Sequence, residues 1–173
     1  MNRKLALVGL FTSAASILFA VESVINLPIP WFRLGLANAV TVLALEWWGI
    51  REALVIVSLR SVLGSVLTGK LFHPDFVFSF VGGIVAALAM SLIVVFGRKW
   101  FGFVGISIIG ALAKNATQLM LAYTLFVRQI RLLSILPLFF ISSLISGLIV
   151  GLISDVVNRG FDSNRAAERV KKR

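Results

Sequence analysis

Apolar residues in this 173-residue chain are gathered into long runs, separated by short polar or proline-containing turns. A hydrocarbon core about 30 Å thick needs roughly 20 apolar residues in a helix, and most of these runs approach or reach that length. Hydrophobic residues make up 59% of the chain and charged residues only 14%. A soluble domain carries about 25% charged residues, so this composition excludes one. The runs are continuous rather than alternating, so the chain is predicted to be an all-α integral membrane protein.

Six membrane-spanning helices are expected, packed as one bundle over residues 1–158 and followed by a basic tail at 159–173. The tight corner at Gly49-Ile50-Arg51 separates the second run from the third, and Pro28 and Pro30 forbid continuation of the first helix. The predicted spans are Leu5–Ile25, Leu34–Gly49, Glu52–Thr68, Phe76–Phe96, Val104–Val127 and Ser134–Val157.

Basic residues near the ends of the spans predict that both termini are cytoplasmic, because cytoplasmic loops carry the excess of Lys and Arg. In that orientation the inner segments hold Arg3, Lys4, Arg51, Arg98, Lys99, Arg159, Arg165, Arg169, Lys171, Lys172 and Arg173. The outer segments hold Arg33, Lys70, Arg128 and Arg131. This distribution is typical of a membrane protein, so we expect lipid contact and no nucleic-acid partner.

Ionisable and amide side chains within the spans are the candidate functional residues, because each is costly in a bilayer. Arg60 lies midway along the third span, Lys114 midway along the fifth, and Glu22 in the outer third of the first. Helical spacing places Arg60, Gly64 and Thr68 on one face, and Ala111, Lys114, Gln118 and Ala122 on another. Each face is expected to point into the bundle.

The charges on these faces do not balance. Two mid-membrane cations, with Arg33 at the outer mouth, face the single nearby carboxylate of Glu22. This excess predicts an anionic ligand such as a carboxylate or phosphate, with the cations holding negative charge and the amides orienting the ligand. The alternative is structural: Glu22 neutralises a cation, and the amides join helices. The predicted substrate-binding residues are Glu22, Arg33, Asn38, Arg60, Lys114, Asn115 and Gln118.

Stripes of small residues elsewhere are expected to serve helix packing, since small side chains let backbones approach closely. They are Gly83, Ala87 and Ser91 on the fourth span and Ser143, Gly147 and Gly151 on the sixth.

The chain lacks the residue groups that most enzymes use for catalysis. It has no Cys, its three Asp residues (Asp75, Asp155 and Asp162) lie in different segments, and His73 is its single His. We therefore expect no catalytic residues, no metal site and no cofactor. A phosphate-binding Gly-rich loop is also missing, so the chain alone is not expected to couple transport to ATP.

Several ordered motifs resemble one bacterial membrane family. They are Glu22–Pro30 (ESVINLPIP), Arg33–Asn38 (RLGLAN), Arg51–Leu54 (REAL), Leu59–Ser65 (LRSVLGS), Gly82-Gly83 and Gly110–Leu119 (GALAKNATQL). Together they resemble the Gx transporter family, also named heptaprenyl diphosphate synthase component I. That family is similar in layout to the substrate-binding S components of energy-coupling-factor (ECF) importers.

The resemblance implies a bundle like an ECF S component, with a pocket in its outer half in the bacterial inner (plasma) membrane. The loops Asn26–Arg33 and Gly69–Asp75 would form its lid. Two family positions differ: Arg33 stands where Lys is usual, and Lys114 where His is usual. An S component docks its transmembrane T component through an Ala-x-x-x-Ala pattern on the first helix. This chain has looser stripes there, Gly9/Ser13 and Thr12/Ser16/Ala20.

Three functions follow as hypotheses. The first is the substrate-binding component of an ECF-type importer that captures a small anionic or amphipathic solute and works with a T component and two ATPases. The second is a non-catalytic membrane subunit of heptaprenyl diphosphate synthase in isoprenoid biosynthesis, with its carboxylates supplied by a partner. The third is a scaffold for a membrane redox or lipid complex, marked by partner binding without a ligand.

Overall fold

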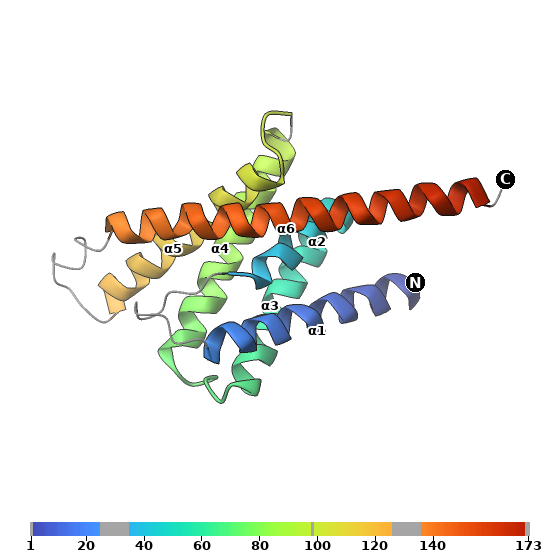
Figure 1. Cartoon of the computed structure of the whole chain (residues 1–173). Helices are drawn as coiled ribbons and strands as arrows, with labels where there is room; N and C mark the ends of the chain where they lie inside the picture. The colour runs from blue at the N-terminus through green and yellow to red at the C-terminus, as the bar shows by residue number, and fades with distance from the viewer. Residues whose placement is uncertain (1, 25–34, 98, 126–135, 172–173) are drawn as a thin grey trace.

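A computed structural model of the protein describes residues 2–24, 35–97, 99–125 and 136–171. These residues form six helices and no strand, which confirms the all-α prediction (Figure 1). The helices are α1 (Asn2–Val24), α2 (Ala37–Trp48), α3 (Ile50–Leu67), α4 (Pro74–Phe96), α5 (Phe103–Leu125) and α6 (Leu136–Lys171). The predicted outer lid Asn26–Arg33 lies outside the described residues.

Four described helices are long and apolar enough to cross a membrane. The qualifying segments are Lys4–Ser23, Pro74–Phe96, Phe103–Leu125 and Leu136–Phe161. Their length and composition indicate a membrane protein. The other two helices, α2 and α3, have 12 and 18 residues. At 1.5 Å per residue these lengths are about 18 and 27 Å. The count of six spans therefore stays a prediction.

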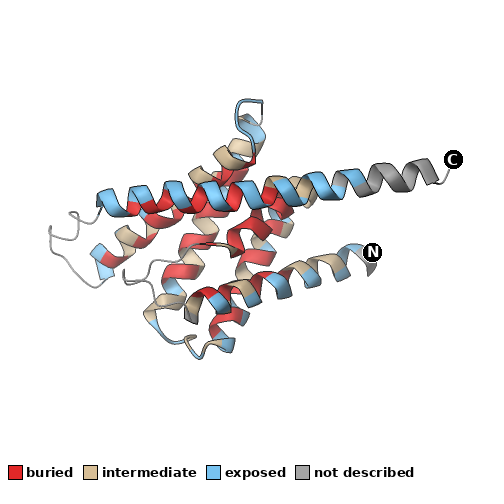
Figure 2. Ribbon diagram, viewed as in Figure 1, coloured by how far each residue is buried: buried red, intermediate tan, exposed pale blue. Residues whose placement is uncertain are grey.

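Helix α2 lies at the centre of the bundle and contacts all five other helices. Its residues Ala37–Leu45 are buried on every side, as expected for a helix that is apolar around its whole circumference (Figure 2). Its short length and central position place the polar side chain of Asn38 inside the molecule rather than at an edge.

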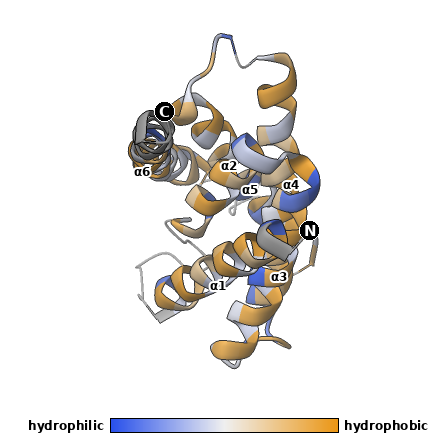
Figure 3. Ribbon diagram, turned by 90° about the vertical axis from the view of Figure 1, so that its right-hand side faces the viewer, coloured by the Kyte–Doolittle hydropathy of each residue, from blue (hydrophilic) through white to orange (hydrophobic). Residues whose placement is uncertain are grey.

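The outward faces of the other helices are strongly apolar (Figure 3). Leu92 on α4 is 57% exposed and Ile145 on α6 is 53% exposed. Apolar surface on this scale is rare on soluble monomers and is the expected surface of a protein in contact with lipid.

The small-residue stripe on α6 serves close helix packing, as predicted. A Cβ atom built on Gly147 would lie 2.5 Å from the Cα of Ile108 on α5, and Gly151 meets the backbone of Val104 in the same way. Only glycine leaves room for two backbones at this distance. The two helices are thus held together along the first half of α5.

Helix α6 continues beyond the predicted span end at Val157, as one 36-residue helix that reaches Lys171. The Trp47 indole supports this extension by donating a 2.7 Å hydrogen bond to the Asn158 side chain and by stacking on Phe161 at 4.6 Å. The extension projects past the bundle on the same side as the start of α1 (Figure 1).

Gly147 offers a direct test of the α5–α6 packing. Gly147→Ala should lower the thermal stability of the purified protein, because the added methyl meets backbone that cannot move aside. We expect a loss of about 1–3 kcal/mol. Gly160→Ala is the matched control, since nothing lies within 4 Å of a Cβ there and alanine favours a helix. Equal melting temperatures for the two variants would contradict the packing.

The crossing of α2 and α3 can be tested with single cysteines, because the chain contains none. Arg51 and Phe72 are exposed near opposite ends of α3. In intact cells, a membrane-impermeant maleimide should label Phe72→Cys at once and Arg51→Cys only after permeabilisation. If both cysteines react from the same side, or Arg51→Cys reacts from neither, then α3 does not span the membrane.

Candidate functional site

Four of the predicted site residues meet at one small cavity among the helices. Glu22 comes from α1, Asn38 from α2, Arg60 from α3 and Lys114 from α5. The cavity has a volume of about 10 Å³, and Phe19, Gly35, Ala37 and Ser79 complete its lining. A volume of this size holds about one water molecule. We call these four residues with their cavity the polar cluster.

Arg60 is the least exposed residue of the polar cluster. It is 4% exposed, and its Nη2 donates a 2.6 Å hydrogen bond to Oδ1 of Asn38. Gly83 of α4 lies beside the guanidinium, since a Cβ built there would make an ordinary contact of 3.7 Å with Nη2. Nε and Nη1 of Arg60 are also buried, and neither has a hydrogen-bond partner among the described residues. The guanidinium thus keeps two donors for an acceptor in the cavity.

Glu22 is hydrogen-bonded to the backbone before α2. The Glu22 carboxylate accepts a hydrogen bond from the backbone N–H of Leu36. Gly35, with a φ of 76°, makes the turn that precedes α2, and its carbonyl accepts from the Asn38 N–H at 2.7 Å. A residue with a side chain would be strained at this φ. This turn fixes where Asn38 enters the polar cluster.

Lys114 reaches the same place from α5. It is 8% exposed, and a Cβ built on Gly35 would lie 3.5 Å from both the Lys114 Nζ and the Ser146 Oγ of α6. The ammonium therefore lies beside the turn before α2, next to α6. Arg60 and Lys114 both border the cavity, and Glu22 is the carboxylate that borders it with them.

The other two amides lie elsewhere on α5. The Asn115 Nδ2 donates to the Ser143 Oγ at 2.7 Å, and Ser143 in turn donates to the Phe139 carbonyl at 2.6 Å. Asn115 thus joins α5 to α6. This is the role that the structural alternative assigned to the amides, namely to join helices. Gln118 is 3% exposed, and its Oε1 has no hydrogen-bond partner in the described part of the chain. Its side chain packs beside Gly82 of α4.

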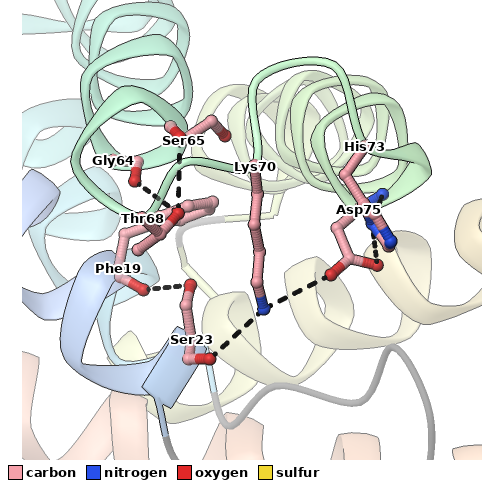
Figure 4. Close-up of polar contacts among 8 residues, drawn as sticks. All are labelled: Phe19, Ser23, Gly64, Ser65, Thr68, Lys70, His73 and Asp75. Atoms are coloured by element: carbon pink, nitrogen blue, oxygen red, sulfur yellow. Dashed lines mark hydrogen bonds and ion pairs between the residues drawn. The ribbon is translucent and has the colours of Figure 1, made fainter.

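The remaining predicted residue, Arg33, lies outside the described residues. The second predicted lid, the turn Gly69–Asp75, is described and packs against the end of α1 (Figure 4). The Lys70 Nζ lies 3.5 Å from the Ser23 carbonyl and 3.7 Å from an oxygen of Asp75. His73 caps the start of α4 by accepting from the Asp75 N–H at 3.3 Å. This turn therefore closes the bundle next to the α1 segment that carries Glu22.

Sequence reasoning missed Gly35, Ser79 and Ser146 as neighbours of the cations. Of these three residues, only Gly35 could have been found from the sequence, because it belongs to the motif Arg33–Asn38. The two serines resemble many other small residues in the spans, and only the packing of α4 and α6 identifies them. In the described chain no three His, Cys, Asp or Glu residues come together as a metal site would need.

Comparison with known proteins supports the resemblance found in the motifs. No curated protein and no solved structure matches the chain. One family model, described as heptaprenyl diphosphate synthase component I, matches residues 11–157 and so covers most of the chain. The matched region contains every member of the polar cluster. The protein belongs to the heptaprenyl diphosphate synthase component I family.

Proposed function

We propose that this protein is a membrane-embedded binding component that captures a small anionic or amphipathic solute for an ECF-type importer. The observation that carries the proposal is the buried Arg60 guanidinium, with two donors that lack partners among the described residues. Leaving such groups unpaired costs about 1–3 kcal/mol each, more when the group is charged. An anion in the cavity would supply the missing acceptors.

The charges around the cavity support an anion over a neutral solute. Arg60 and Lys114 border it together, and the Glu22 carboxylate also accepts from the Leu36 backbone. Arg60 and Lys114 are at least nine-tenths buried, which is rare for charged residues without a functional reason. The proposed binding residues are Glu22, Arg33, Asn38, Arg60, Lys114, Asn115 and Gln118, with the first contact made by Arg60 and Lys114.

The small size of the cavity requires movement on binding. A space for about one water molecule cannot hold a solute of several atoms. The segments bordering the cavity would have to separate, and the loops Asn26–Arg33, which lies outside the described residues, and Gly69–Asp75 are the proposed lids. In the predicted orientation, both chain ends are cytoplasmic and the lids lie on the outer side of the bacterial inner membrane.

The outward face of α1 is the proposed docking surface for a T component. Thr12 and Ser16 are buried against the bundle, so that stripe serves internal packing. Gly9 and Ser13 are exposed, and nothing lies within 4 Å of a Cβ built on Gly9. A partner helix could approach closely there. Two ATPases would complete the transporter, since this chain has no nucleotide-binding loop.

The family description favours a second candidate function. A component I of heptaprenyl diphosphate synthase would be a membrane subunit in isoprenoid biosynthesis. Such a subunit would be non-catalytic by itself, because magnesium-dependent diphosphate chemistry needs clustered carboxylates and the Asp residues of this chain lie in separate segments. The two candidates differ in the partner that each requires.

An affinity purification from native membranes should separate the two candidates. The tagged chain is expected to recover a T component and two ATPases, identified by mass spectrometry. The Gly9→Leu variant should lose these partners, because its larger side chain blocks the α1 surface, whereas Gly160→Leu should keep them. Recovery of a polyprenyl diphosphate synthase instead would reject the importer and establish the enzyme subunit.

Substitution of the buried cations should abolish solute capture without unfolding the protein. Arg60→Met and Lys114→Met each remove a charged donor, and a charge-assisted hydrogen bond contributes about 1.5–3 kcal/mol, or roughly 10–100-fold in affinity. The measurement is untargeted mass spectrometry of the solutes released from the purified protein, with helical content checked by circular dichroism. Arg159→Met, whose side chain is 78% exposed, is the control. If both buried variants retain the same solutes as the native chain, the site is misassigned.

A further inference from the structure

A groove opens between α5 and α6 beyond the point where their backbones meet. Gly147 and Gly151 hold α6 against the first half of α5, and the two helices diverge towards Leu125 and Leu136 (Figure 1). The space between them has a volume of about 340 Å³. It is far larger than the cavity of the polar cluster, so the bulky part of a ligand fits in the groove and not in that cavity.

The walls of the groove suit a hydrocarbon chain. They are formed mainly by Leu, Phe, Met and Ala side chains, among them Leu119, Met120 and Phe140. Met120 is 68% exposed and Phe140 is 52% exposed, so the groove opens on the outer surface of the bundle. Both helices are long and apolar enough to span the membrane, and in a bilayer this opening faces lipid rather than water. An occupant would enter sideways from the hydrocarbon.

The inner end of the groove adjoins the polar cluster. Asn115 and Ser143 line the groove and are hydrogen-bonded to each other. Lys114 precedes Asn115 on α5, and Ser146 follows Ser143 by about one helical turn on α6. The Lys114 Nζ and the Ser146 Oγ are both 3.5 Å from the position of a Cβ built on Gly35. Gly35 and Lys114 line the cavity. The two sites thus lie on consecutive residues of α5, with Asn115 lining the groove and Lys114 lining the cavity.

We propose that the groove binds the hydrocarbon tail of a single-chain amphipathic anion, whose charged head is held by Lys114 and Arg60. The proposal rests on the proposed function for the head and adds the chemical class of the solute. At about 340 Å³, the groove has room for one hydrocarbon chain of medium length. The Asn115–Ser143 hydrogen bond is the contact that opens when head and tail are bound together.

Photocrosslinking tests the tail site. The probe is dodecanoate carrying a diazirine near its methyl end, added to the full chain in nanodiscs, with labelled peptides identified by mass spectrometry. Labelling is expected within residues 112–123 and 136–143. Ala116→Trp should reduce it to background, because Ala116 lines the groove and the indole would fill it. Leu119→Trp should act in the same way. Ala14→Trp, at an exposed position on α1, is the matched control and should label normally.

Dodecanol with the same diazirine tests the contribution of the head. Lys114→Met should lower the labelling by dodecanoate about tenfold or more, the loss expected for one charge-assisted contact. It should leave labelling by dodecanol unchanged. Equal labelling by the two probes in the native chain, or labelling that survives both tryptophan variants, would overturn the proposal.

The two proposals fail in different ways. If Ala116→Trp retains the anionic solutes of the native chain while Lys114→Met loses them, the polar cluster binds an anion and the groove is no part of the site. If Lys114→Met and Arg60→Met both retain those solutes, the proposed function fails, and dodecanoate labelling of the groove would then report a bilayer chain only and overturn the joint site.

Discussion

The hydrogen bond between Arg60 and Asn38 is the contact on which the centre of this bundle depends. A guanidinium in the middle of a membrane protein must find acceptors within the protein, because lipid offers none. Asn38 supplies one acceptor from the central helix, and Gly83 of α4 lies beside the guanidinium. Four helices meet around this one cation. Gly35 before α2 is explained by this meeting, since its φ of 76° forms the turn that positions Asn38, and a Cβ there would lie 3.1 Å from the Asn38 Nδ2.

Close backbone packing and the candidate binding site occupy different parts of the α5–α6 pair. A membrane protein gains little from apolar burial between helices, so polar contacts and close backbone packing carry more of its specificity. In this chain the two are separated in space. The glycines of α6 pack against the first half of α5, whereas the polar cluster and the groove lie further along the same helix. One half of the helix pair is therefore fixed, and the other half is available to a ligand.

Much of the fold could be predicted because the bilayer imposes strict rules on sequence. Apolar runs located all six helices, and the described bounds of α3 and α4 lie within two residues of the expected ones. Helical spacing correctly identified the buried faces: Arg60 and Gly64 are buried on α3, and Lys114 and Gln118 on α5. Helix α6 continues past the expected end of the span at Val157, because polarity marks where a helix leaves lipid and not where its backbone hydrogen bonding stops.

The candidate site was harder to predict, because it depends on how helices pair. Spacing along α5 placed Asn115 and Gln118 with Lys114, yet neighbouring residues on a helix point about 100° apart. Asn115 consequently meets Ser143 on α6, while Lys114 meets the turn before α2. The groove left no sequence signal at all. Its lining residues are ordinary apolar side chains, and it exists only because two glycines hold α6 close to α5 at one end.

The unbroken length of α6 connects the groove to a helical segment that extends beyond the hydrocarbon. The 36 residues of this helix extend about 54 Å, well beyond the hydrocarbon thickness of about 30 Å. Gly147 lies about 12 Å from Phe139, at the groove, and about 36 Å from Lys171 at the far end. Between these points α6 is held at Gly151 and, through Asn158 and Phe161, at Trp47 of α2. A displacement of α6 at the groove would reach its last turns only by moving these contacts.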